Sequence, residues 1–166
     1  MNKGMEGAAL RSFTELNAWQ KARQVRKAVS ALVKTWPSEE KFRLTDQIIR
    51  SSRGPSSHIA EGFGSFYEKE NRRYCRIARG SLYETMDHLC TAYDEGYLEK
   101  SALKEHWALV DEAIRVLNGY LRYLQKFVPN DRVSEPEAHY GEEFPIFVDP
   151  PADLLDDDVP SPKSDN

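Results

Sequence analysis

The chain has 166 residues, of which 40% are apolar and 11% aromatic, enough to fill the hydrophobic core of one domain. Its formal net charge of -4 is unevenly divided: residues 1–128 carry 21 basic and 16 acidic side chains, whereas residues 129–166 carry 2 and 11. No apolar run approaches the roughly 18 residues of a transmembrane helix, and the first residues lack the apolar stretch of a secretory signal. We therefore expect a cytoplasmic protein with a mildly basic body and a strongly acidic tail.

The first half of the body predicts two helices after a flexible N-terminal segment, residues 1–11. Apolar residues spaced three and four apart predict a helix over residues 16–36. A second helix is expected over residues 38–62, with Ser38 as its N-cap. Gly54-Pro55 lies near its middle, so this helix should be kinked or interrupted there.

The second half of the body predicts two further helices with short connections. One spans about residues 67–95, and Gly96 follows where a left-handed cap is wanted. The other carries an unbroken heptad pattern from Leu103 to Val128, with Ser101 as its cap. Residues 12–128 therefore predict an all-α fold, an antiparallel up-down four-helix bundle. Its expected inward positions in the second and third helices are Phe42, Ile48, Ile49, Ile59, Phe63, Tyr74, Ile77, Ala78, Leu82, Leu89 and Ala92.

Residues 129–166 have a different composition, with seven prolines and eleven acids. Such a segment predicts a disordered, acidic, proline-rich tail. A short apolar island at 144–148 interrupts it, and its side chains Phe144, Ile146 and Phe147 are candidates for binding a partner. The island either docks on its own bundle or a neighbouring subunit, or serves as a linear motif for another protein.

Catalytic and metal-binding patterns are sparse. The sequence His58-Ile-Ala-Glu61 reverses the Glu-x-x-His order of di-iron bundles, and the Glu84–His88 pair has no second copy. Cys75 and Cys90 would lie about 22 Å apart on one helix, too far for a disulfide, and no Cys-x-x-Cys pair suggests zinc. We therefore expect no enzyme activity, no metal and no cofactor.

Cationic residues recur at intervals of three and four in the third predicted helix, with Tyr67 near enough to stack on a base. Such a stripe is typical of a face that contacts phosphates, although it is also compatible with a solvated helix face paired to Glu68, Glu70 and Glu84. The candidate RNA- or DNA-binding residues are Lys69, Arg72, Arg73, Arg76 and Arg79, joined by Arg50 and Arg53 of the second helix.

Five segments carry a resemblance to a known family, in order and over about residues 12–127: FTELNAWQKA (13–22), LTDQIIR (44–50), IAEGFG (59–64), IARGSLYE (77–84) and GYL (96–98). They resemble the four-helix-bundle proteins encoded within intervening sequences of bacterial 23S ribosomal RNA genes. That family includes the accessory variability proteins that assist reverse transcriptases of diversity-generating retroelements. The resemblance implies a homopentamer, a basic surface, RNA or DNA binding and no catalytic activity.

Several residues in these segments are expected to serve the fold and its assembly: Glu61, Gly62, Gly64, Ser81 and Glu84. The two carboxylates among them would pair with Arg50 or with an arginine of a neighbouring subunit. The chain departs from the family in having His58 at a usual asparagine and its proline moved by one position. We therefore expect a non-enzymatic, oligomeric nucleic-acid-binding accessory protein, working beside a reverse transcriptase or ribosomal RNA; the alternative is a protein-interaction adaptor that acts through the tail.

Overall fold

The computed structural model describes residues 10–128 and Pro150, and all its regular elements in that part are helical. The predicted acidic tail, including Phe144, Ile146 and Phe147, lies outside the described residues apart from Pro150, which is buried. Four α-helices dominate: α1 (Asn17–Leu32), α2 (Leu44–Gly64), α3 (Glu68–Asp94) and α4 (Lys100–Gln125). Short 3-10 helices precede or follow them, η1 (Phe13–Glu15), η2 (Val33–Thr35) and η3 (Ser38–Phe42).

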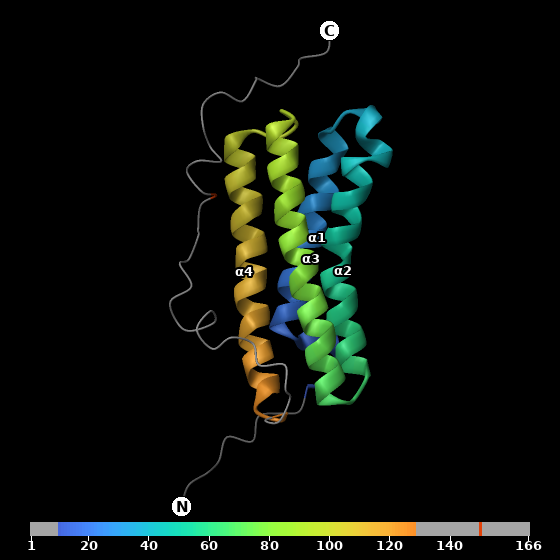
Figure 1. The fold of residues 1–166 in the computed structure, drawn as a ribbon, viewed down its shortest axis with the longest axis vertical. Helices are drawn as coiled ribbons and strands as arrows, with labels where there is room; N and C mark the ends of the chain where they lie inside the picture. The colour runs from blue at the N-terminus through green and yellow to red at the C-terminus, as the bar shows by residue number, and fades with distance from the viewer. Residues whose placement is uncertain (1–9, 129–149, 151–166) are drawn as a thin grey trace, which may run out of the picture.

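The four α-helices pack side by side. Each contacts the next in the chain, and α4 also contacts α1. In Figure 1 the ribbon colour advances up α1, down α2, up α3 and down α4. The predicted all-helical class is confirmed for the described residues, which contain no strand. None of these helices has the length and apolarity needed to cross a bilayer.

The core follows the heptad pattern of the sequence. Leu103, Val110, Leu117 and Leu121 of α4 are buried at spacings of seven, seven and four residues, so one face of the helix points inward along its whole length. The neighbouring helix α1, which contacts α4, contributes small and branched residues such as Val25 to this core. Small side chains on one helix facing leucines on another allow close packing.

The start of α2 differs from the prediction. Ser38 lies in a 3-10 helix instead of capping an α-helix, and Phe42, expected in the core, is 85% exposed. Arg43 has a non-helical backbone, with φ -118° and ψ -113°, which separates η3 from α2. The Glu40 carboxylate accepts the N–H of Leu44 at 3.2 Å, and Leu44 occupies the buried position instead.

Of the two predicted alternatives at Gly54-Pro55, a kink or an interruption, the interruption is wrong, because α2 continues through these residues as one helix. Proline removes one N–H donor from the helix. Pro55 is buried in the bundle. Three nearby serines of the same helix donate their hydroxyls to the carbonyl three residues earlier: Ser51, Ser52 and Ser56. These small side chains satisfy their own hydrogen bonds within the helix, so α2 can lie close to both of its neighbours.

The connection from α2 to α3 turns at Phe66 rather than at a glycine. Gly62 and Gly64 both belong to α2, whereas Phe66 has φ 52° and is 91% exposed. Gly62 is required for a different reason: a Cβ there would lie 2.8 Å from Oδ1 of Asn71 and 3.1 Å from its Cα. Asn71 in turn donates from Nδ2 to the hydroxyl of Tyr120 at 2.9 Å. Gly62 therefore permits the contact between α2 and the start of α3.

Replacement of Gly62 by alanine should destabilise the fold by about 2 kcal/mol, because the backbone of Asn71 cannot yield as a flexible side chain would. Gly64→Ala is the matched control, since a Cβ at Gly64 meets nothing within 4 Å and alanine favours the helix. Urea unfolding followed by circular dichroism measures both. Equal stability of the two variants would contradict the close-approach role of Gly62.

Three predictions about α3 and α4 have different outcomes. Gly96 has φ 73°, so the left-handed cap after α3 is confirmed. Ser101 is not a cap, because α4 begins at Lys100 and Glu99 stands before it without a side-chain cap. Ile77, expected in the core with Tyr74, is 39% exposed, and Tyr74 is half-buried. The buried row of α3 instead passes through Cys75, Ala78, Leu82 and Leu89.

The two cysteines are both free thiols. Cys75 is fully buried, and burial raises the pKa of its thiol to about 12. Cys90 is half-buried, and burial together with the carboxylates of Asp87 and Asp94 raises the pKa of its thiol as well. Because the thiolate is the reactive form, both are poor nucleophiles near neutral pH.

Candidate nucleic-acid interface

The predicted cationic stripe of α3 divides into two rows. Arg72 is only 4% exposed, and Arg76 and Arg79 are half-buried. Arg79 donates to Oδ1 of Asn118 on α4 at 3.1 Å, so this row lies along the α4 side of the helix. Residues at intervals of four and three share one helix face, and here that face is partly covered. The five cations therefore do not form one exposed stripe, because Arg72 is buried and Arg76 and Arg79 are half-buried.

The other row, Lys69 and Arg73, does face solvent. Arg73 already has partners: its Nε donates to the Glu70 carboxylate at 2.9 Å, and its guanidinium lies 4.6 Å from the centre of the Tyr74 ring. The hydrogen bond and charge of Glu70 raise the pKa of the Arg73 guanidinium. An exposed pair of this kind contributes little to stability and lowers the net charge offered to a ligand.

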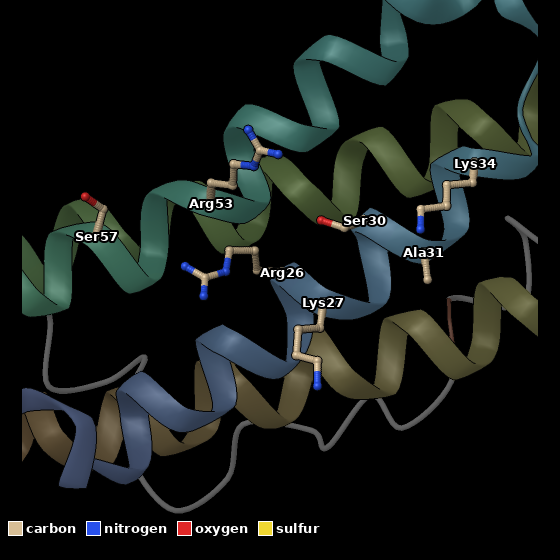
Figure 2. A pocket seen from close by; sticks show the side chains of 7 residues that line it. All are labelled: Arg26, Lys27, Ser30, Ala31, Lys34, Arg53 and Ser57. Carbon is tan, nitrogen blue, oxygen red and sulfur yellow. The ribbon is translucent and has the colours of Figure 1, made fainter.

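Arg50 and Arg53 of α2 are both exposed, but they differ in their partners. Nε of Arg50 lies 3.1 Å from the carboxylate of Asp46, one turn earlier. Arg53 pairs with no carboxylate in the described part of the chain. It lies on the side of α2 that faces α1 (Figure 2).

A cationic surface on α1 was missed by the sequence prediction. Residues 16–37 contain five lysines and arginines and no acid. One of the five, Lys21, pairs with Glu112 of α4 at 2.7 Å. The other four recur at helical spacing and form no ion pair with any described carboxylate: Arg23, Arg26, Lys27 and Lys34. The signal was present in the sequence as the longest acid-free stretch of the basic body.

Three of these cations, Arg26, Lys27 and Lys34, line a groove together with Arg53 of α2, which we call the α1–α2 groove (Figure 2). Its volume is about 530 Å³, and it is largely open to solvent. Figure 2 shows Arg53 on α2 and Arg26 and Ser30 on α1, with the guanidinium groups of Arg53 and Arg26 pointing in different directions. The groove is lined by Arg26, Lys27, Ser30, Ala31, Lys34, Arg53 and Ser57.

The groove combines a hydrogen-bonded arginine with two exposed lysines. Nη1 of Arg26 donates to the hydroxyl of the buried Ser56 at 3.1 Å, and that hydroxyl donates to the carbonyl of Arg53 at 3.2 Å. The guanidinium of Arg26 is thereby held beside α2. Lys27 and Lys34 are exposed and can adjust to a ligand. Four cations with no acid among them produce a positive potential that favours an anion.

The predicted structural residues lie elsewhere, on the α2–α3 side. Glu61 and Glu84 are exposed, and each lies near a histidine one turn away, at 3.3 Å from His58 and 3.7 Å from His88. Their predicted pairing with Arg50 is wrong within the chain. Ser81 is half-buried, with Oγ 3.1 Å from where a Cβ on Gly54 would stand. Over the residues that are described, no three His, Cys, Asp or Glu side chains gather as metal ligands would.

Comparison with known proteins agrees with the segments that carry the resemblance. The family model described as 23S rRNA-intervening sequence protein matches residues 14–119. No curated protein matches the chain. The matched range includes α1, α2 and α3 completely and most of α4, and so the whole α1–α2 groove. Because the match covers well over half of the 166 residues, this chain belongs to the 23S rRNA-intervening sequence protein family.

Proposed function

We propose that the protein is a non-enzymatic accessory protein that binds the phosphate backbone of RNA through the cations of α1 and the facing Arg53. The observation that carries this proposal is the acid-free stretch of residues 16–37, three of whose cations line one groove with Arg53. Lysines and arginines that neutralise phosphates supply most of the affinity in nucleic-acid binding that does not depend on sequence.

The family description adds support for RNA over other polyanions, since it refers to a segment of 23S ribosomal RNA. A phosphate backbone is common to RNA and DNA, so the same surface would also accept an RNA–DNA intermediate of a reverse transcriptase. We propose RNA as the primary ligand.

The salt dependence of binding tests this proposal directly. Four cations that contact phosphates should give a plot of log K against log salt with a slope of about -3, or roughly a 100-fold loss of affinity between 50 and 200 mM salt. Fluorescence anisotropy with a labelled fragment of 23S ribosomal RNA, at several salt concentrations, measures this slope. Affinity that is independent of salt, or no binding at the lowest salt concentration, would refute the proposal.

We also propose that the protein self-associates, with a pentamer as the state implied by the family resemblance. Aromatic side chains remain exposed at the end of the bundle where α2 meets α3 and α4 ends: Phe66 by 91%, Tyr67 by 58%, Tyr123 by 53% and Phe127 by 55%. Large exposed apolar patches are typical of interaction surfaces. Light scattering at micromolar concentration should give a mass that is a multiple of 19.1 kDa. A single 19.1 kDa species would exclude self-association.

A further inference from the structure

The covered cations of α3 lie beside a second row of cations on α4. Nη1 of Arg79 donates to Oδ1 of Asn118 at 3.1 Å, which places this side of α3 against the side of α4 that carries Asn118. On an α-helix, residues about three, four or fourteen positions apart share one face. The cations of the two rows therefore form one surface, which we call the α3–α4 strip: Arg72, Arg76, Arg79, Lys104, Arg115 and Arg122.

The strip differs from the α1–α2 groove because its α3 cations are covered and already have partners. Arg72 is only 4% exposed, and Arg76 and Arg79 are half-buried. All three have interaction partners, as does Lys104 of α4. A guanidinium stays charged near neutral pH, and its burial is tolerated where an anion compensates the charge. This arrangement favours an anion that is always present, such as a segment of the same chain.

The tail is the segment of this chain with the matching charge. Residues 129–166 carry 11 acidic and 2 basic side chains. The tail begins directly after α4, and Figure 1 shows the orange end of α4 and the green start of α3 at the same end of the bundle. Arg72 lies near that start of α3. The tail therefore begins close to one end of the strip.

The tail is also long enough to cover the strip. Pro150 stands 22 residues after Val128, and an extended chain of that length spans up to roughly 75 Å. The 26 residues of α4, at about 1.5 Å each, make a helix about 39 Å long. Pro150 is buried, as expected of a tail that lies against the protein.

We propose that the α3–α4 strip binds the chain's own acidic tail, residues 129–166. Carboxylates of the tail pair with the strip, and the covalent tether keeps them at an effective concentration on the order of millimolar. The order of helix contacts places α3–α4 opposite α1–α2 in the bundle, so the tail leaves the α1–α2 groove open. Exclusion of RNA from the strip is a consequence that rests on the proposed function, whereas the binding of the tail does not.

Zero-length cross-linking of the full chain with a carbodiimide tests the contact, because this reagent joins a carboxylate only to an amine that touches it. Peptide mapping by mass spectrometry should find tail carboxylates joined to Lys104 several-fold more often than to Lys27 or Lys34. The two control lysines are exposed and Lys104 is half-buried, so accessibility alone would give the reverse order. Cross-links that favour the control lysines, or none from the tail, would overturn the proposal.

A second test measures RNA affinity in two backgrounds. Replacing the 11 tail acids by their amides should raise RNA affinity about 10-fold at low salt, because the strip becomes available to phosphates. Arg76→Gln with Lys104→Gln should remove most of this gain and should change affinity less than about 2-fold when the acidic tail is present. Equal effects of the two substitutions in both backgrounds would contradict occupation of the strip by the tail.

Arg11→Gln with Lys41→Gln is the matched control, since it removes the same two charges from exposed positions outside both surfaces. It should leave the gain intact, and circular dichroism checks that all variants remain helical. Absence of RNA binding in both backgrounds would refute the proposed function alone, because the cross-linking pattern still decides where the tail binds.

Discussion

Removal of three cations from the α1–α2 groove should weaken RNA binding on the order of 100-fold at low salt, at about 1 kcal/mol for each phosphate contact. The variant combines Lys27→Ala, Lys34→Ala and Arg53→Ala. None of the three side chains pairs with a described carboxylate, so their loss removes no ion pair from the fold. The slope of log K against log salt should become less negative by about two units, from about -3 to about -1. Anisotropy titrations over a salt series measure both effects.

A variant with the same net charge provides the control. Lys69→Ala, Arg122→Ala and Lys126→Ala remove three exposed cations outside the groove, including one from the stripe that the sequence predicted. Its affinity should fall only a few-fold, because these charges act at a distance and are screened by salt. An equal loss in both variants would mean that net charge alone governs binding and that the groove has no special role.

Leu82→Ala should strongly destabilise the fold. Leu82 is fully buried in the core, and its truncation leaves a cavity, so we expect a loss of about 3 kcal/mol. Ile77→Ala on the same helix is the matched control. Because Ile77 is 39% exposed, its truncation should cost less than about 1 kcal/mol.

Urea denaturation at two protein concentrations distinguishes a loss of packing within one subunit from a loss of contacts between subunits. A loss for Ile77→Ala that grows with protein concentration would show that this side chain lies in a contact between subunits, since association stabilises the folded state by mass action. Equal losses for Leu82→Ala and Ile77→Ala at low concentration would contradict the placement of α3 in the bundle.

The periodicity of the sequence predicted the helices well because burial on a long helix repeats every three and four residues. The heptad of α4, from Leu103 to Leu124, is buried almost as predicted. Periodicity was less informative in α3, where cations occupy a wide arc. Arg72 is 4% exposed, but the spacing of the cations in the sequence does not show whether the side of α3 that carries Arg72 packs on α4 or faces solvent.

The α1–α2 groove was harder to predict because it is formed by two helices. Lys27 belongs to α1 and Lys34 to the 3-10 helix η2 that follows it, and Arg53 stands 19 residues after Lys34 in the sequence, beyond the 3-10 helix η3. Only the packing of α1 against α2 brings them together. The continuity of α2 through Pro55 was also unpredictable from propensity, since the tertiary contacts of a buried proline outweigh one lost hydrogen bond.

The low reactivity of the two native thiols makes site-specific labelling with a spectroscopic probe practical. Cys75 is fully buried with a pKa of about 12, and the pKa of the half-buried Cys90 is also raised. Maleimide chemistry at neutral pH would therefore strongly favour a new, exposed cysteine over either native one. Ser57→Cys would place such a residue in the α1–α2 groove. A fluorophore attached there would report ligand entry by a change in its own emission, without any label on the RNA.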